Sequence, residues 1–247
     1  MRKTRLAAAA VLPALLLVAA CSSNSSDHKG KSDATSSASS VLSGKAPLTK
    51  AQLTSALVTE TDVPGWVIQV SQTDDATDSP DGSDDATLVA DKPDCQPLAD
   101  ITSSKPTIHR MAFVGAAFAK TTTAATPEEV NQMLVASHAP GDAQKVMDSV
   151  KVSLKTCTGF TGVDNSGTRT PFTIGKGPSV SVGDESVSYV MTDTADKETG
   201  AALVTVVKTG DTITAYLSVK SKGGTGTFPL DVARKQSDKL KAVLAKR

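Results

Sequence analysis

The chain has 247 residues, with 26 Lys and Arg against 26 Asp and Glu, so its formal net charge is zero. This balance excludes a strongly basic nucleic-acid-binding protein and an acidic disordered tail protein. Aromatic residues make up only 3% of the chain, which argues against a stacking surface for bases or sugars. Hydrophobic residues make up 39%, which is enough for one hydrophobic core.

The first 20 residues have the three parts of a secretion signal. A basic start with Arg2, Lys3 and Arg5 precedes an apolar run over 6–20, which ends in small residues. A membrane-spanning helix needs about 20 apolar residues, and this run has 15, so it predicts a cleaved signal and not a permanent span.

The end of this signal resembles the lipobox of bacterial lipoproteins, because Val18-Ala19-Ala20 precedes Cys21. In that family the Cys thiol receives a diacylglyceryl group and becomes the first residue after cleavage. Two acyl chains anchor a protein stably to a bilayer. We therefore expect a lipid anchor at Cys21 that holds the protein on the extracytoplasmic face of the cell membrane. The alternative is an ordinary secretion signal that happens to end at a Cys.

Residues 21–47, called the tether below, contain ten Ser in 27 positions and very few apolar side chains. Such a composition predicts a flexible, disordered linker. Two features of the tether resemble chemical motifs, namely His28 and the S-x-x-K spacing over 26–29. We expect neither to act, because a flexible linker does not position a nucleophile or a metal ligand.

Residues 48–247 are expected to form one α+β domain with a central antiparallel sheet and helices packed mainly on one side. The apolar pattern and turn residues predict helices over 50–60, 127–138, 143–157 and 229–246. They predict strands over 66–70, 111–120, 168–174, 185–192, 201–208 and 212–220. An acidic stretch over 74–85 lacks the ligand spacing of a calcium loop, so it is expected to be a surface loop.

Cys95 and Cys157 are the two thiols that remain once Cys21 carries a lipid. Cys95 lies in a segment bounded by Pro93 and Pro97, which is expected to be a loop, and Cys157 lies on the apolar stripe of a predicted helix. Outside the cytoplasm two such residues favour a disulfide bond. A nucleophilic Cys paired with a His and a metal site are the alternatives, and neither has supporting His spacing.

Several short motifs resemble a group of actinobacterial lipoproteins and the extracellular sensor domain of the mycobacterial receptor kinase PknH. These motifs are Asp62-Val63-Pro64-Gly65-Trp66, Cys95-Gln96-Pro97-Leu98 and Cys157-Thr158-Gly159-Phe160. The resemblance spans about residues 48–247 and implies an α+β domain, a groove for an unidentified ligand and no catalytic activity. The sequence departs from the kinase sensor in having one expected disulfide where that domain has two. No ligand residues are carried over from it.

No G-x-S-x-G, H-E-x-x-H, P-loop or G-x-G-x-x-G motif is present in the sequence. Outside the tether, only His109 and His138 are available as a general base, and a single His is more often structural. We therefore expect a protein that is not an enzyme and that has no cofactor and no metal site.

The leading hypothesis is a membrane-anchored ligand-binding or sensor-like module. Trp66, Tyr189 and Tyr216 are candidate ligand contacts because each combines an apolar body with a polar tip, although the same properties suit half-buried core positions. The alternative is a carrier of a lipid or another apolar ligand in the cell envelope, which would have an aliphatic cavity of ~300–1,000 Å³. A third possibility is a structural protein that binds only envelope proteins. The expected partners are membrane lipid through Cys21 and an unknown small molecule, lipid or envelope protein, but not nucleic acid.

Overall fold

The structure is a computed structural model that describes residues 45–71, 87–124, 126–196 and 200–247. The predicted signal over 1–20, the lipidation site Cys21, most of the tether and the acidic stretch over 74–85 lie outside the described residues. Those expectations therefore stay predictions.

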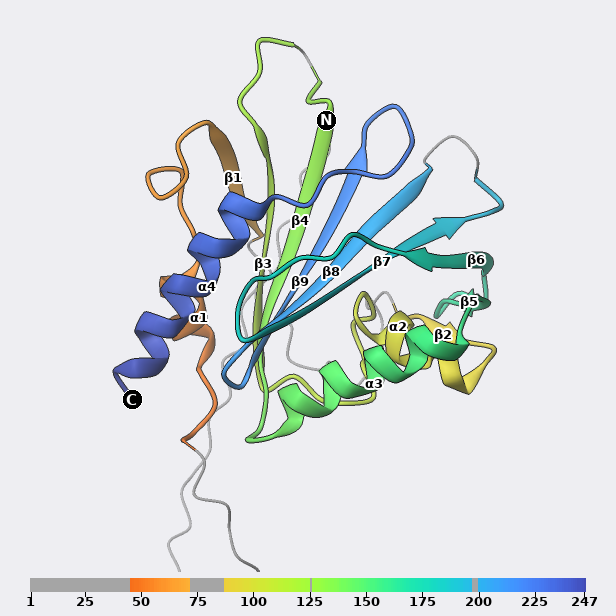
Figure 1. The fold of residues 1–247 in the computed structure, drawn as a ribbon, viewed down its shortest axis with the longest axis horizontal. Coiled ribbons are helices and arrows are strands. Elements are labelled where there is room, and N and C mark those ends of the chain that lie inside the picture. The colour runs from red at the N-terminus through yellow and green to blue at the C-terminus, as the bar shows by residue number, and fades with distance from the viewer. Residues whose placement is uncertain (1–44, 72–86, 125, 197–199) are drawn as a thin grey trace, which may run out of the picture. The chain divides into compact units, whose positions relative to one another are not determined.

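Nine antiparallel strands form one sheet in the order β1-β3-β4-β9-β8-β7-β6-β5-β2 (Figure 1). The strands are β1 (Trp66–Ser71), β2 (Val89–Ala90), β3 (Ala112–Lys120), β4 (Glu129–Ser137), β5 (Gly159–Val163), β6 (Arg169–Lys176), β7 (Glu185–Asp193), β8 (Ala201–Thr209) and β9 (Thr212–Lys220). The six strands that the sequence predicts are all confirmed, with ends that move by one or two residues. The central antiparallel sheet of the expected α+β class is likewise confirmed.

The helices are α1 (Lys50–Ala56), α2 (Gln96–Asp100), α3 (Asp142–Thr156) and α4 (Leu230–Ala245), with a 3-10 turn, η1 (Pro93–Cys95), directly before α2. A capping box starts α1, since the side chains of Thr49 and Gln52 each bond the other's backbone N–H. This helix ends at Ala56, four residues before the predicted end. The helices predicted over 143–157 and 229–246 are confirmed as α3 and α4.

The helix predicted over 127–138 is wrong, because residues 129–137 form strand β4. This strand lies between β3 and β9 and pairs with both. Its start, Thr126-Pro127-Glu128, has the composition of a helix N-terminus. Pairing on both edges and burial of alternate side chains such as Met133 and Val135 outweigh that local preference.

The loop predicted around Cys95 is also wrong, because η1 and α2 occupy residues 93–100. The short strands β2 and β5, which pair with each other, were not expected either. All of these elements are short, so they contain too few residues for a periodic pattern to show in the sequence.

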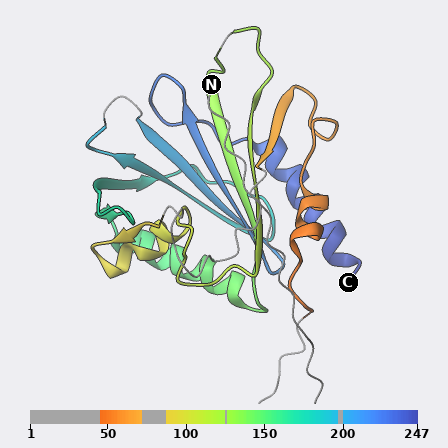
Figure 2. The same ribbon diagram turned by 180° about the vertical axis from the view of Figure 1, so that it is seen from behind.

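Helices cover both faces of the sheet, which corrects the expectation that they pack mainly on one side (Figures 1 and 2). Alternate residues of β8 show the division. Leu203 and Val207 belong to a cluster with α1 and α4, whereas Val204 and Val206 belong to a second cluster with α2 and α3. A strand that is apolar on both sides needs a cover on each, and β8 is such a strand.

Side chains of α4 hold the loop that follows α1. The buried amide of Gln236 accepts a bond from Val58 N at 3.0 Å and donates one to Ala56 O at 2.9 Å. Lys239 Nζ lies 2.6 Å from Asp62 Oδ2. This hydrogen bond contributes most to lowering the pKa of Asp62 from its ordinary value of 3.8 to about 2. The first cluster is therefore joined by polar contacts as well as by apolar packing.

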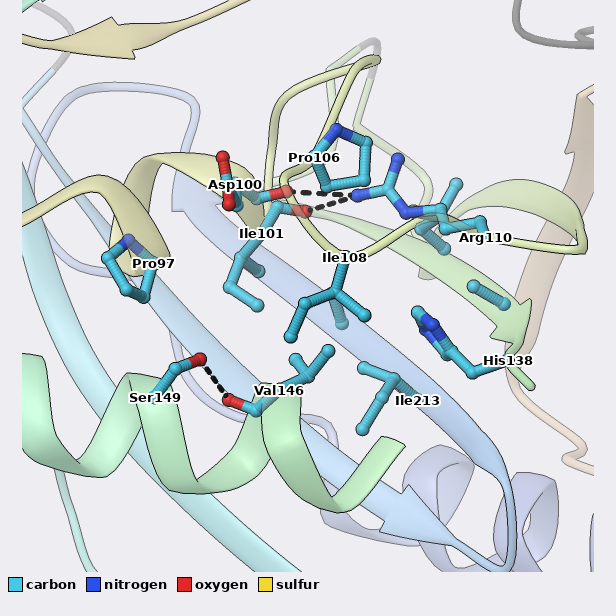
Figure 3. A pocket seen from close by; sticks show the side chains of 13 residues that line it. Pro97, Asp100, Ile101, Pro106, Ile108, Arg110, His138, Val146, Ser149 and Ile213 are labelled. Atoms are coloured by element: carbon cyan, nitrogen blue, oxygen red, sulfur yellow. Dashed lines mark hydrogen bonds between the residues drawn. The ribbon is translucent and has the colours of Figure 1, made fainter. Parts of the chain in front are cut away.

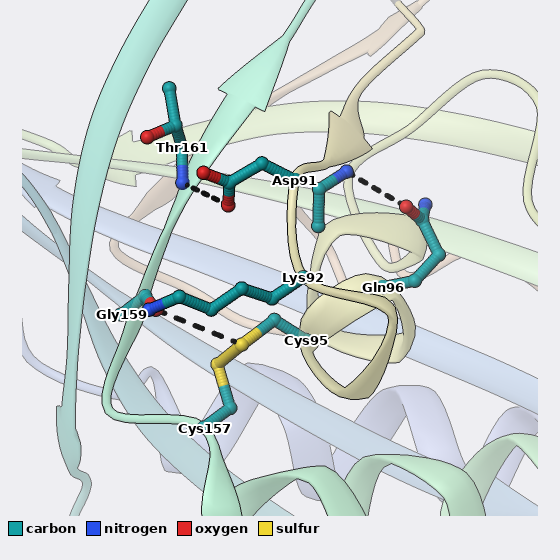
Figure 4. Close-up of a disulfide and its surroundings, with 8 residues drawn as sticks. Asp91, Lys92, Cys95, Gln96, Cys157, Gly159 and Thr161 are labelled. Atoms are coloured by element: carbon teal, nitrogen blue, oxygen red, sulfur yellow. Dashed lines mark hydrogen bonds between the residues drawn. A yellow bond between two sulfur atoms is a disulfide. The ribbon is translucent and has the colours of Figure 1, made fainter.

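A disulfide between Cys95 and Cys157 joins the start of α2 to the end of α3 (Figure 4). Two further contacts hold the same region. Lys92 Nζ donates to Gly159 O at 2.6 Å, and Asp91 Oδ1 accepts from Thr161 N at 2.8 Å. Cys95 Sγ also lies 3.8 Å from Gly159 O, but a disulfide sulfur carries no proton to donate, so this is a packing contact. The predicted bridge is present in the structure.

We predict that removing the bridge with Cys95→Ala and Cys157→Ala lowers the free energy of unfolding by about 4 kcal/mol, because it closes a loop of 62 residues. Urea unfolding of the oxidised protein and of the double variant measures this difference. An unchanged urea midpoint, or two free thiols in the exported protein, would contradict the prediction.

Candidate ligand-binding site

A pocket lies between α2, the segment over 101–110, α3 and the sheet face formed by β4 and β9 (Figure 3). Nine of its lining residues are apolar and four are polar. They are Pro97, Ile101, Pro106, Ile108, Leu134, Ala136, Val146, Ile213 and Ala215, with Asp100, Arg110, His138 and Ser149.

The segment over 101–110 forms one wall of the pocket, which we call the roof, and Arg110 ties it together. Arg110 Nη1 donates to Ser103 O at 2.8 Å, and Nη2 donates to Asp100 O at 3.0 Å and to Ile101 O at 3.3 Å. These carbonyls belong to the last residue of α2 and to the residues after it, where the backbone lacks helical partners. The guanidinium also lies 5.8 Å from the centre of the Phe113 ring. Arg110 therefore holds the roof in one conformation.

Asp100 is fully engaged by neighbouring groups even though it lines the pocket. Its Oδ1 accepts from Gln96 Nε2 at 2.6 Å, and its Oδ2 accepts from Thr107 N at 3.0 Å. The hydroxyl of Ser149 is likewise engaged, because it donates to Val146 O at 2.9 Å within α3. These two polar residues act in local structure.

His138 is the most buried of the polar lining residues, with 3% of its surface exposed. Its Nδ1 lies 3.1 Å from the backbone O of His109. A carbonyl only accepts, so Nδ1 carries the proton and Nε2 of the neutral ring is an acceptor. Burial lowers the pKa of His138 below its ordinary value of 6.5, and the charge of Arg110 acts in the same direction. The carboxylates of Asp142 and Asp211 oppose this shift.

The pocket is small in this conformation. About 30 Å³ is available to the centres of water molecules, which is room for about two waters. A drug-sized ligand needs a site of ~300–1,000 Å³. A ligand larger than a few atoms therefore has to displace part of the wall, and the roof is the segment held by the fewest regular elements.

The structure places the three aromatic candidates in the core, and none of them lines the pocket. Trp66 Nε1 donates to Asp231 Oδ2 at 2.8 Å, and Tyr189 OH donates to Leu98 O at 3.0 Å. The ring of Tyr216 packs edge-on against Phe228 with centres 5.4 Å apart. Burial raises the pKa of both tyrosines. These positions fit the core role that the sequence left open.

His138 is the one pocket residue that the sequence analysis singled out, as one of two possible bases. His109 is exposed and contributes its backbone oxygen. The roof residues Ile108 and Arg110 were missed. In the sequence, the position of Arg110 is marked only by a preceding segment that contains Ser and Pro, and many loops share that pattern.

Within the described parts of the chain, no three His, Cys, Asp or Glu side chains are grouped so that they could hold a metal ion. No helix among residues 45–247, as far as they are described, is long and apolar enough to cross a membrane.

We predict that the free energy of unfolding falls as the pH drops from about 8 to about 5, because the unfolded chain protonates His138 more readily than the folded chain does. The effect begins near the ordinary pKa of 6.5 and ends below the lowered folded pKa. Thermal unfolding of the wild type and of His138→Gln across this range measures it, with the exposed His109→Gln as the control. Equal pH slopes in wild type and His138→Gln would contradict the assignment.

The fold has a counterpart among solved structures. The extracellular domain of PknH from Mycobacterium tuberculosis matches with a TM-score of 0.51 and 15% identity, over 83% of this chain and 100% of that one. An uncharacterised protein from Mycobacterium smegmatis matches at a TM-score of 0.27 and 13% identity, over 79% of this chain and 93% of that one, which is too weak to compare folds. No curated protein sequence matches the chain.

The family comparison covers most of the domain. The PknH-like extracellular domain family matches residues 48–239, which confirms the resemblance seen in the sequence motifs. The family indicates an extracytoplasmic, sensor-like domain and is not a known catalytic fold. This chain belongs to the PknH-like extracellular domain family.

Proposed function

We propose that this protein is a lipid-anchored sensor-like module that binds a small ligand in the pocket beneath the roof and does not transform it. The observation that carries the proposal is the pairing of the polar groups around the pocket. Asp100, Arg110 and Ser149 bond to neighbouring protein groups, so the Nε2 acceptor of His138 is the polar atom left for a ligand.

The chemistry of the lining defines the ligand class. An apolar wall with one acceptor suits a small, mostly apolar molecule with one hydrogen-bond donor, such as a hydroxyl group. An anion would face the lone pair of Nε2, and the guanidinium of Arg110 already donates to three carbonyls. Protonation of His138 would turn the acceptor into a donor, so binding should weaken at low pH.

The same arrangement supports a non-catalytic role. Among the described residues that line the pocket, the one side-chain hydroxyl is that of Ser149, and it donates to Val146 O. The two oxygens of Asp100 already accept from N–H groups. A general base needs a reacting group within hydrogen-bond reach, and no side chain of the pocket lining offers one.

A carrier of a lipid is the second candidate, and the apolar lining is the observation in its favour. The available volume of about 30 Å³ is at least tenfold below the ~300–1,000 Å³ expected for such a cavity. A lipid carrier would therefore need a much larger opening between α3 and the roof than a sensor of small molecules would.

The affinities for phenol and for toluene, measured by ligand-observed NMR, test the site. We expect phenol to bind more tightly than toluene in the wild type, and His138→Phe to remove that preference. Ala136→Leu should fill the pocket and weaken the binding of phenol and of toluene by about tenfold or more. The control is Val152→Leu on the exposed side of α3, which should change neither affinity. Equal binding of the two probes in the wild type, or no effect of Ala136→Leu, would contradict the proposal.

The anchor is tested separately with Cys21→Ala in the full chain. We expect the wild type to stay with membranes and to carry a diacylglyceryl group at Cys21 by mass spectrometry, because two acyl chains bind a bilayer stably. The variant should lack that mass. A wild-type chain without a lipid at Cys21 would refute the anchor and leave the pocket proposal standing.

A further inference from the structure

Several segments meet at the end of the domain where the tether joins it. Ser137 Oγ donates to Leu48 O at 2.7 Å, and Met111 N donates to Ser137 O at 2.9 Å. The guanidinium of Arg247 donates to Ala46 O. Figure 1 shows the first described residues and the C-terminal label at this end. We call this region, formed by residues 45–48, 109–111, 137–141, 209–212 and 241–247, the tether-proximal end.

Three basic side chains that pair with none of the described carboxylates gather here. Lys45 and Lys246 are exposed, and Arg247 is partly exposed. Among the described residues, no carboxylate lies within ion-pair distance of these three side chains.

Two of the nearby carboxylates have basic partners. Asp184 lies 3.8 Å from Lys241 Nζ, and Asp142 lies 2.7 Å from Lys145 Nζ. Asp211 accepts only from the backbone Gly141 N, at 3.3 Å, so it keeps its negative charge. Three basic side chains against this one carboxylate leave the side-chain charge at this end positive, although the predicted exported chain as a whole carries more acidic than basic residues.

An exposed apolar side chain lies at the same end. Met111 has 59% of its surface exposed, which is among the highest values for a large apolar residue in the described chain. It directly follows the roof. A flexible apolar side chain beside basic groups is typical of contacts with the headgroup region of a bilayer.

We propose that the tether-proximal end binds the anionic phospholipid headgroups of the membrane to which the protein is tethered. The proposal rests on the lipid anchor at Cys21. From Cys21 to the first described residue, Lys45, the tether runs over 24 peptide bonds, and the flexible chain that its composition predicts would have a root-mean-square reach of about 27 Å. That reach keeps this end close to the bilayer, and the basic groups then orient it toward the anionic surface. The His138 corner of the pocket belongs to this end, so it faces the membrane.

Sedimentation with vesicles tests the surface without the anchor. The protein is the exported chain over 22–247, which contains both hydrophobic clusters and the disulfide. We expect binding to vesicles that contain phosphatidylglycerol, little binding to phosphatidylcholine alone, and loss of binding as salt is raised. Each basic residue near an anionic surface strengthens binding roughly fivefold, so Lys45→Gln with Lys246→Gln should weaken it roughly 25-fold.

The matched control removes the same charge elsewhere, with Lys155→Gln at the far end of α3 and Lys222→Gln after β9, both exposed. It should bind as the wild type does, and Met111→Ser should bind more weakly. Equal binding to the two kinds of vesicle, or equal weakening by the control pair, would overturn the proposal. If the Lys45 and Lys246 variant does not fold, the lipid and salt dependence of the wild type decides the question. The result is independent of whether Cys21 carries a lipid.

Discussion

The bond between Cys95 and Cys157 determines how one half of the domain is built. The helix α2 has only five residues, so it has too few backbone bonds to be stable alone. The bridge fixes its start to the end of α3, and Tyr189 holds its middle through Leu98 O. Because α2 is held in this way, the roof that follows it begins from a fixed point, and the pocket exists between the roof and α3.

The two faces of the sheet differ in how their covers are held. On one face α4 is 16 residues long and packs with α1 over a large apolar cluster, assisted by Gln236. On the other face the cover consists of α3, the short α2 and irregular segments. Arg110 replaces regular backbone pairing there with three bonds to carbonyls. A sensor needs a part that responds to a ligand inside a stable frame, and this second cover has the weaker local structure of the two.

The sequence predicts those elements whose periodicity is long enough to read. The apolar stripe of α3, the apolar run of β8 and the alternation in β9 are visible without any tertiary information. The strand β4 was predicted as a helix because the local signals at Thr126 and Pro127 favour a helix start, whereas pairing with β3 and β9 decides the outcome. The pocket could not be predicted from the sequence. Arg110 bonds to carbonyls of an irregular segment, and His138 and His109 come together only in the folded chain. The aromatic candidates were chosen for their chemistry, and their burial depends on partners such as Asp231, 165 residues away from Trp66.

The central claim is that the disulfide holds α2 and the roof in place while the opposite face is stable without it. Hydrogen exchange of the oxidised protein and of the Cys95→Ala, Cys157→Ala variant tests this claim most directly. The account predicts that exchange over 93–111 speeds up more in the variant than exchange in α1 and α4, which rises only with the lowered global stability. Uniformly faster exchange across both faces, or unchanged exchange over 93–111, would contradict it.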